Sequence, residues 1–248
     1  MKSLASAVVF GLFLLVNNSC THHLYPHSVS NQSYTISSEV PMDSSIYQLL
    51  SPYKRGVDTQ MQEVLGKTDI MLTKAQPESS LGNFVADAQL VAAQKIDKKV
   101  AISVCNYGGI RLPYIAAGVI TKEKIYELMP FDNMLTIVEV SGSQVQQLCD
   151  VIAKAKGWPI SGCSFKIKDG KAIDIQVNNM PLHENLMYKL AISDYLVNGG
   201  DNIDFLKSCK KKTTAIFIRD TLMEYLLQLT AKNQSLHPII ENRISYAE

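Results

Sequence analysis

Three short stretches of the sequence carry side chains that could hold a small ligand. They are Asn106-Tyr107-Gly108-Gly109-Ile110-Arg111, Met129-Pro130-Phe131-Asp132-Asn133 and Ile192-Ser193-Asp194-Tyr195-Leu196-Val197-Asn198-Gly199-Gly200-Asp201. Each combines an aromatic with an amide, a carboxylate or a guanidinium, and the paired glycines let the backbone turn tightly. An aromatic face stacks on flat rings, and a guanidinium offers a planar fork of donors. Taken alone, each stretch also has an ordinary explanation as a strand and a loop, with the aromatic packed in the core.

In chain order, the three stretches resemble the C-terminal, substrate-binding domain of the secreted 5′-nucleotidase / UDP-sugar hydrolase family. A fourth stretch, from Glu78 to Ala88, adds to the resemblance, because the binding domain of that family opens with a helix of this pattern. The resemblance extends from Met61 to Ile244, which is most of the expected mature chain. Four ordered blocks are more specific than any single Gly-Gly pair.

The resemblance implies which side chains meet the substrate. In that family two aromatics sandwich the nucleobase, and Phe131 and Tyr195 match their positions. Stacking on an aromatic contributes about 1–3 kcal/mol per base and tolerates different bases. Arg111 matches an arginine that contacts the substrate, and Asn106 matches a position that hydrogen-bonds the base. A plain surface salt bridge remains the alternative role for Arg111.

Further roles follow from the same resemblance. Asp201 matches a carboxylate that can accept hydrogen bonds from ribose hydroxyls, and Gly108 and Gly109 let the backbone come close to the ligand. Lys95 aligns where the family commonly has a second arginine; it keeps the charge but loses the bidentate geometry. Tyr107 replaces a usual glycine, so its side chain is expected to narrow the pocket or shift the loop.

Residues needed for hydrolysis are missing from the sequence. In the family, a separate N-terminal domain holds two metal ions with aspartates, histidines and an asparagine. This chain has five histidines, three of them before residue 28 and the others isolated at His183 and His237. It has no Asp-x-His, Gly-Asn-His-Asp or Gly-His-x-His run, no Walker-type loop and no Gly-x-Ser-x-Gly elbow. We therefore assign it no catalytic residue, metal ligand or cofactor, and expect the dimetal site on a partner chain.

Composition limits the class of partner. A chain of 248 residues with 46% hydrophobic residues can bury one large core or two small ones. A net charge of +1 with 19% charged residues excludes an electrostatic footprint for a nucleic-acid polymer or an anionic membrane. A free nucleotide or nucleoside needs only one or two well-placed cations. The lysines that crowd residues 207–212 are best explained as a solvated loop.

The first residues are typical of a bacterial lipoprotein signal. Lys2 supplies the positive start, and Ala5 to Val16 is an apolar run too short to span a membrane. A small residue then precedes Cys20, although the two asparagines before it depart from the usual pattern. We expect residues 1–19 to be a signal peptide and Cys20 to carry the lipid anchor, in the cell envelope on a periplasmic or surface face. Simple secretion, with Cys20 lost or free, is the alternative.

Residues 20–50 are predicted to be a flexible tether, because they are rich in Ser, His, Tyr, Pro and Asn and have no sustained period. Histidines in such a linker are usually solvent-facing, so we assign them no metal. The other four cysteines are Cys105, Cys149, Cys163 and Cys209. Their spacings are wide and no C-x-x-C pair occurs, which favours buried thiols over a disulfide framework or a zinc site.

Hydrophobic patterning predicts the elements that position these residues. Predicted strands cover Ile70–Thr73, Val100–Val104, Met134–Val140, a hairpin over Phe165–Val177 turned at Asp169-Gly170, Tyr188–Ser193 leading into the stretch that holds Tyr195, and a last short strand at Arg243-Ile244. Predicted helices cover Met61–Thr68, Leu81–Ala92 behind serine caps, a segment that begins at Thr121 and ends before Pro130, Gln144–Lys156 behind a capping box at Ser141, and Ile218–Leu229. Residues 45–55 form a weakly defined approach. The irregular interleaving predicts an α+β fold, with a mixed sheet and packed helices in one domain at residues 51–248.

The sequence thus favours the nucleotide-binding domain of a split 5′-nucleotidase-type hydrolase, with a separate metallophosphatase chain supplying the metals. We expect no phosphoester hydrolysis by this chain alone. Two other classes stay open: a stand-alone nucleoside- or nucleotide-binding lipoprotein, and an interaction scaffold with a degenerate pocket.

Overall fold

The structure is a computed structural model that describes residues 28, 30–35, 37 and 40–248. The chain divides into two units, residues 1–49 and 50–248. The predicted signal peptide, Cys20 and most of residues 21–39 of the predicted tether lie outside the described residues. Within the described part, no helix combines the length and the apolar composition needed to cross a bilayer.

Asp43 precedes helix α2 (Ser44–Met61) and caps it, because its carboxylate accepts hydrogen bonds from the backbone N–H groups of Ser45 at 2.9 Å and Ile46 at 3.2 Å. No residue of α2 is buried. The sequence reading was therefore wrong on two segments: residues 45–55 are helical, and the predicted helix at 61–68 is mostly the strand β1 (Val64–Thr68). Strand β1 pairs with the distant strand β5 (Gly118–Thr121), a partner that local sequence does not reveal.

A five-stranded mixed sheet forms the centre of the domain, in the order β12-β6-β11-β3-β7. Its strands are β12 (Lys211–Phe217), β6 (Met134–Ser141), β11 (Met187–Ser193), β3 (Val100–Val104) and β7 (Ile160–Ser161). Strand β11 runs parallel to β3 and antiparallel to β6. Both faces of β11 are buried, since Leu190 and Ile192 enter one hydrophobic cluster and Ala191 enters the other.

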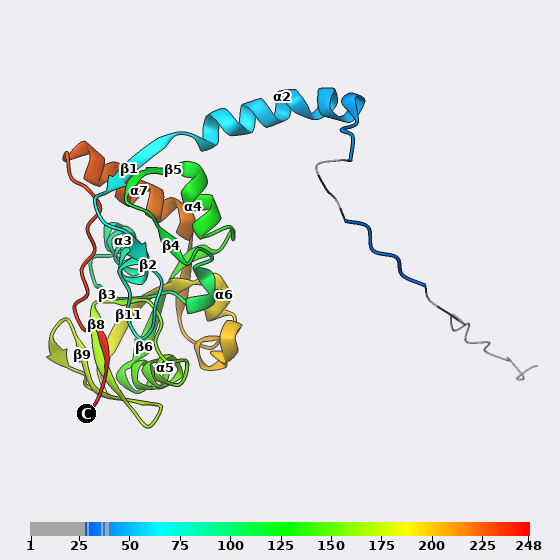
Figure 1. Ribbon diagram of the computed structural model, residues 1–248. Helices are drawn as coiled ribbons and strands as arrows, with labels where there is room; N and C mark the ends of the chain where they lie inside the picture. Colours follow the sequence, from blue (N-terminus) through cyan, green and yellow to red (C-terminus); the bar gives the residue numbers. More distant parts are fainter. Residues whose placement is uncertain (1–27, 29, 36, 38–39) are drawn as a thin grey trace, which may run out of the picture. The chain divides into compact units, whose positions relative to one another are not determined.

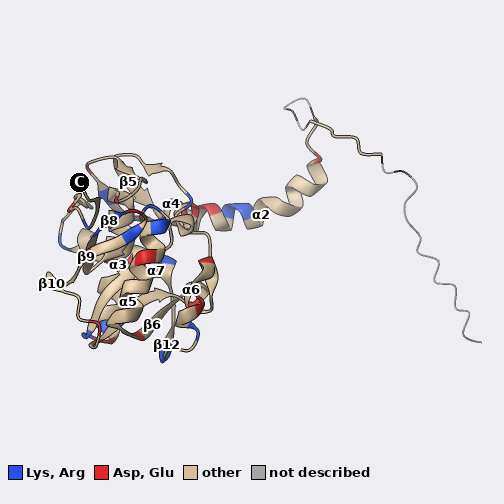
Figure 2. Cartoon of the chain, turned by 90° about the horizontal axis from the view of Figure 1, so that it is seen from below, with Lys and Arg blue, Asp and Glu red and all other residues tan. Residues whose placement is uncertain are grey.

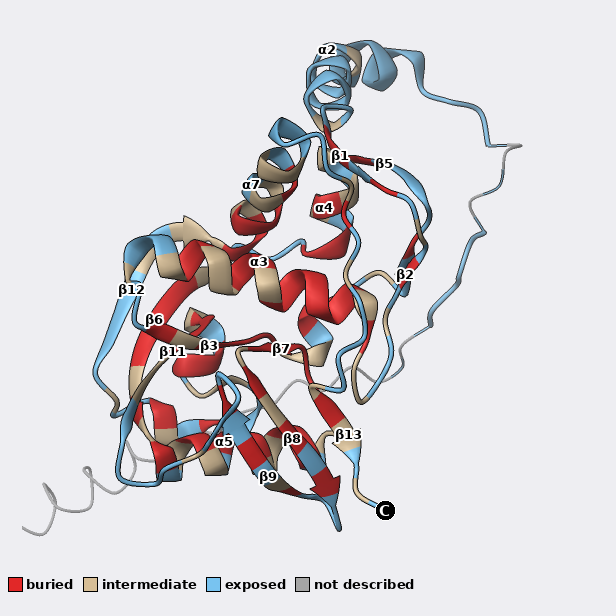
Figure 3. Cartoon of the chain, turned by 90° about the vertical axis from the view of Figure 1, so that its left-hand side faces the viewer, coloured by how far each residue is buried: buried red, intermediate tan, exposed pale blue. Residues whose placement is uncertain are grey.

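Helices and a second sheet cover the two faces of the central sheet (Figures 1 and 3). One cluster unites the sheet with α3 (Ser80–Ile96), α4 (Lys122–Leu128) and α7 (Ile218–Ala231). The other unites it with α5 (Gly142–Lys154) and a four-stranded sheet, β10-β9-β8-β13. That sheet contains β8 (Cys163–Lys168), β9 (Lys171–Val177), β10 (Met180–Pro181) and β13 (Ile244–Tyr246). A short ribbon of β2 (Leu72–Thr73) and β4 (Tyr114–Ile115) completes the strands.

The predicted α+β class, with mixed sheets and packed helices, is confirmed. Helix starts were predicted well because their caps are local: the Ser79 hydroxyl accepts from the Gly82 N–H at 3.0 Å, and the Thr121 hydroxyl accepts from the Lys124 N–H at 3.4 Å. The capping box between Ser141 and Gln144 is also present, at the start of α5.

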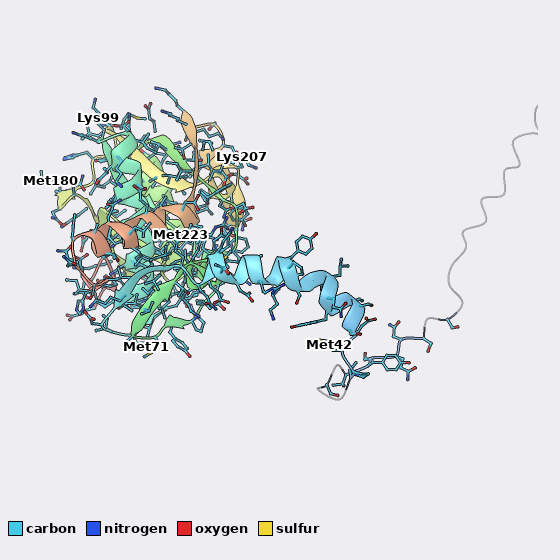
Figure 4. All side chains as sticks on the ribbon, turned by 90° about the horizontal axis from the view of Figure 1, so that it is seen from above. Met42, Met71, Lys99, Met180, Lys207 and Met223 are labelled. Carbon is cyan, nitrogen blue, oxygen red and sulfur yellow. The ribbon has the colours of Figure 1, made fainter. Side chains whose placement is uncertain are left out.

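The lysine-rich segment after residue 206 was misread as a loop throughout. Lys211 and Lys212 lie on β12, an edge strand of the central sheet, where exposed lysines discourage further strand pairing. Lys207 precedes β12 in the chain. It lies at the periphery of the domain in Figure 4, where Met71 and Met180 are also peripheral. Lysines and arginines share the face shown in Figure 2 with acidic residues rather than forming a single basic patch. The four cysteines in the described residues are free thiols, and Cys209 alone among them is not buried.

Candidate functional site

The first of the three stretches leaves the carboxyl end of β3. Its backbone turns through a short 3-10 helix, η1 (Tyr107–Gly109), in which the Gly109 N–H donates to the Asn106 carbonyl at 3.0 Å. A Cβ atom on Gly109 would lie 2.9 Å from Asn106 Oδ1, so the turn requires glycine here. The buried Cys105 thiol lies directly before the turn, and burial raises its pKa to about 12. This thiol therefore stays neutral and acts as a packed side chain.

Lys74 braces the outside of this loop, a contact that sequence reasoning missed. Its ammonium donates to the Ile110 carbonyl at 2.7 Å and lies 4.0 Å from the centre of the Tyr107 ring. Burial and the neighbouring positive charge of Arg111 lower the pKa of Lys74. Tyr107 thus packs under a cation instead of closing the pocket. No local pattern around Lys74 indicated this, because the loop lies far along the chain.

Phe131 follows α4 and presents its ring to solvent, with 39% of the residue exposed. Core packing therefore does not explain this aromatic. The Arg111 guanidinium carbon lies 5.8 Å from the centre of the ring. Asn133, two residues further on, is half-buried.

Arg219, in the first turn of α7, holds the backbone beside Phe131. The guanidinium donates to the Phe131 carbonyl at 3.3 Å and to Asp132 Oδ1 at 2.7 Å, and it lies 4.2 Å from the centre of the Tyr126 ring. Arg219 is buried, and within the described part of the chain its Nε has no hydrogen-bond partner. A buried cation at a helix start is unfavourable by itself, so its partners on the Phe131 loop are what stabilise it.

Tyr195 lies in the one-turn helix α6 (Asp194–Val197), which directly follows the predicted strand and was not itself predicted. The strand β11 ends at Ser193, whose hydroxyl caps α6 by accepting from the Leu196 N–H at 3.2 Å. The Asp194 carboxylate accepts from the Met134 N–H at 3.0 Å and so ties α6 to the chain that follows Phe131. Tyr195 is 46% exposed, again an aromatic that the core does not use.

Asp201 stands in the glycine-rich turn after α6, inside the 3-10 helix η2 (Gly200–Asn202). Its two carboxylate oxygens accept from Asn106 Nδ2 at 2.7 Å and from the Tyr195 hydroxyl at 3.0 Å. The hydrogen bond to Asp201 raises the pKa of the Tyr195 phenol. The first and third stretches are therefore joined through side chains.

Residues from all three stretches line one cavity of about 350 Å³. It is lined by Asn106, Gly108, Gly109, Arg111, Phe131, Asn133, Tyr195 and Asp201. The volume falls within the roughly 300–1,000 Å³ of small-molecule sites. Two exposed rings, one guanidinium and one carboxylate in the lining of one cavity suit a ligand with a flat apolar part and a polar or anionic part. Asn133 belongs to the second stretch, but we did not single it out from the sequence.

Lys95 is absent from the described residues that line the cavity. It lies in the last turn of α3, where its ammonium forms a 2.5 Å ion pair with Glu224 of α7. The side chain is 45% exposed, so the pair is a surface interaction. Lys74 and Arg111 are the cations that the structure brings to the cavity loop. We therefore leave Lys95 out of the site.

Among the described residues, no group of three or more His, Cys, Asp or Glu side chains is arranged to hold a metal ion. The cavity offers one carboxylate, and protein donors already contact both of its oxygens. The site as described can bind and orient a small molecule through stacking, hydrogen bonds and one guanidinium.

Comparisons with known proteins agree with this fold. A 5′-nucleotidase of Vibrio parahaemolyticus is 24% identical over 181 residues, which cover 69% of this chain and 31% of the relative. Protein UshA of Escherichia coli is 27% identical over 173 residues, which cover 66% of this chain and 30% of the relative. The chain thus spans about a third of the length of these curated relatives.

Solved structures show the same fold. A 5′-nucleotidase precursor from Thermus thermophilus superposes with a TM-score of 0.70 at 24% identity, covering 84% of this chain and 44% of that one. The NAD nucleotidase of Haemophilus influenzae superposes with a TM-score of 0.65 at 19% identity, covering 83% and 42%. The sequence model described as 5′-nucleotidase, C-terminal domain, matches residues 59–208, more than half of the chain. The chain belongs to the 5′-nucleotidase C-terminal domain family.

Proposed function

We propose that the cavity binds a nucleotide or nucleoside, with the base between the rings of Phe131 and Tyr195. Arg111 binds the phosphate or the sugar, and Asn106 donates to or accepts from the edge of the base. The observation that carries the proposal is that two exposed rings, Phe131 at 39% and Tyr195 at 46%, line the same cavity and belong to neither hydrophobic cluster. The names of the relatives, 5′-nucleotidase and NAD nucleotidase, support a ligand that contains a base.

Within this proposal, the chain is the substrate-binding part of a split 5′-nucleotidase-type hydrolase, and a separate metallophosphatase chain supplies the dimetal site. The absence of a metal-holding group among the described residues motivates this division of labour. Two metal ions that clamp the attacking and leaving oxygens need a dense set of ligands, which the cavity does not provide.

Two measurements test the proposal in sequence. Calorimetric titration of the purified chain with adenosine and AMP measures binding, and no heat of binding for either ligand would refute the nucleotide site. Phosphate release from AMP is then assayed for a candidate metallophosphatase alone and mixed with this chain. A gain in rate that is lost in the Phe131→Ala variant supports the split enzyme. Binding without any gain favours the alternative of a stand-alone nucleoside- or nucleotide-binding lipoprotein.

An interaction scaffold with a degenerate pocket is the remaining alternative. It predicts no binding of adenosine or AMP, and association with a partner chain that does not change in Phe131→Ala. The two exposed rings argue against it only because they line one cavity together with a guanidinium and a carboxylate.

We also propose that the protein is anchored in the cell envelope through a lipid on Cys20, facing the periplasm or the cell surface. The proposal rests on the sequence alone, since Cys20 lies outside the described residues. Mass spectrometry of the mature N-terminus checks it. A diacylglyceryl-modified cysteine at position 20 is expected, and an unmodified N-terminus at another residue would refute the anchor.

A further inference from the structure

Helix α2 has an apolar face that the described part of the chain leaves uncovered. Apolar residues recur along it at spacings of three and four, which places their side chains on one face of a helix. We call this face the α2 stripe; it consists of Ile46, Leu49, Leu50, Tyr53 and Val57. These residues are 54% to 71% exposed. Figure 3 shows α2 exposed along almost its whole length.

The pattern of α2 is typical of a helix that packs against something. Most of the stability of a helix in a protein comes from packing its apolar face, and α2 buries none of its 18 residues. Pro52 lies inside α2 and removes a backbone hydrogen bond, which weakens the helix further when it stands alone. Apolar anchors at i, i+3, i+4 and i+7 are those of a helix that enters a groove on a partner protein.

The ribbon that follows α2 exposes two more apolar side chains. Val64 of β1 is 58% exposed and Val119 of β5 is 61% exposed. The two strands pair with Val119 opposite the exposed Lys67, so this valine lies on the outer face of the ribbon. Uncovered apolar residues therefore continue, in chain order, from α2 into the domain that carries the cavity.

The place of α2 in the chain indicates which partner covers it. The matching family model describes a C-terminal domain and begins at residue 59, so most of α2 precedes the matched region. This chain covers 31% and 30% of the two curated relatives, and the rest of each relative therefore lies mainly before that region. Helix α2 enters the domain from the side on which the relatives carry the part that this chain lacks.

We infer that the α2 stripe is the docking surface for the separate metallophosphatase chain, which receives it in an apolar groove. This inference rests on the proposed function and adds the surface through which the two chains associate. No residue of α2 is among the described residues that line the cavity of about 350 Å³. Docking on α2 thus leaves the cavity open, and the two chains should associate with or without a nucleotide.

The charge of α2 fits a protein groove better than an anionic lipid surface. Helices that lie on such a membrane are usually rich in lysine and arginine on their polar face. Residues 43–63 contain two basic side chains against three acidic ones, a net charge of −1; they are Lys54 and Arg55 against Asp43, Asp58 and Glu63.

Two double variants test the inference. Leu50→Glu/Tyr53→Glu places two negative charges in the stripe, and Gln48→Glu/Thr59→Glu places two on the opposite face as the matched control. The probes are the secreted metallophosphatase chains of the source organism that lack a domain of this family, and biolayer interferometry measures their association with the full mature chain. One of them should bind the wild type. The stripe variant should bind it at least roughly 30-fold more weakly, which corresponds to one hot-spot residue, and the control should stay within about twofold.

The stripe variant should still bind adenosine as the wild type does, which shows that its domain is folded. Equal association of the wild type and the stripe variant would overturn the inference, as would the failure of every such chain to bind the wild type. Two further results would assign the stripe to another occupant and also overturn it. One is a dimer of this chain in analytical ultracentrifugation that the stripe variant does not form. The other is flotation of Cys20→Ala with phosphatidylglycerol vesicles that is lost when the stripe changes are added.

A rate assay separates this inference from the proposed function. With AMP, the stripe variant should need a roughly 30-fold higher chain concentration than the wild type to reach the same gain in phosphate release. The same gain at equal concentrations would sink the inference and leave the split enzyme standing. If the wild type binds neither adenosine nor AMP, the proposed nucleotide site fails. The association measurement needs no nucleotide, so it still decides whether the stripe docks the metallophosphatase.

Discussion

Replacing Phe131 by alanine removes one proposed stacking surface and little else. The ring is 39% exposed and belongs to neither hydrophobic cluster. Its described aromatic contact is with the Arg111 guanidinium, whose carbon lies 5.8 Å from the ring centre. The free energy of unfolding should therefore change by less than the roughly 3–5 kcal/mol typical of a buried phenylalanine replaced by alanine. The binding free energy should change more.

The magnitude follows from stacking. A base on an aromatic contributes about 1–3 kcal/mol, so Phe131→Ala should raise the dissociation constant for adenosine about 5- to 150-fold. Calorimetry measures the constant. Fluorescence offers a second assay, because the native chain has a single, buried tryptophan, Trp158. An exposed tryptophan in Phe131→Trp should keep the affinity and be quenched when a base stacks on it.

Tyr114→Ala is the matched control for this prediction. Tyr114 is 54% exposed and is not among the described residues that line the cavity. Its loss should leave adenosine binding unchanged, while its effect on unfolding should resemble that of Phe131→Ala. Wild-type affinity in Phe131→Ala, or equal losses in the two variants, would refute the stacking account.

Three other variants test how the site is held. Gly200→Ala places a methyl group 2.5 Å from the Tyr195 ring and should cost up to the full stacking contribution of about 1–3 kcal/mol in calorimetry, whereas Gly56→Ala, with open space around it, should bind normally. In Arg219→Lys, the single ammonium cannot reach both the Phe131 carbonyl and Asp132. Denaturant unfolding should therefore show a loss of about 1.5 kcal/mol in the free energy of unfolding, at the lower end for charged hydrogen bonds because Asp132 is exposed. Adenosine binding should also weaken, and unchanged binding would separate Arg219 from the site. Burial raises the pKa of Cys105 to about 12, whereas the thiol of the unfolded chain has a pKa of about 8.5. The stability contributed by the neutral thiol is therefore lost as the pH rises from the unfolded pKa toward the folded pKa. The unfolding free energy of Cys105→Ala should therefore fall less steeply with pH there, by up to roughly 1.4 kcal/mol per pH unit, and parallel curves would contradict the assignment.

Local signals allowed much of the fold to be predicted. The caps at Ser79, Thr121 and Ser141 and the apolar runs of β3 and β6 depend on neighbouring residues, and these elements were predicted close to their observed bounds. Strands β1 and β12 were missed because their stability comes from distant partners. The end of β11 at Ser193 was predicted, but the single helical turn of α6 that carries Tyr195 was not, because four residues are too few to show a helical period.

The residues of the site likewise fall into those that local motifs indicate and those that no local motif indicates. The two rings, the glycine turns and Arg111 lie in recognisable motifs, so the sequence brought them forward. Lys74 and Arg219 have no motif, because each acts on a loop that is far away in the chain. Lys95 was brought forward by the resemblance, but its ammonium pairs with Glu224 and it is not among the described residues that line the cavity.

A crystal structure of the protein with bound adenosine tests the central claim most directly. The account predicts the base between the rings of Phe131 and Tyr195, with Asp201 still bonded to the Tyr195 hydroxyl. A base in the polar cavity of about 380 Å³ lined by Cys163, Asn178 and Arg243, or a base that contacts neither ring, would contradict it.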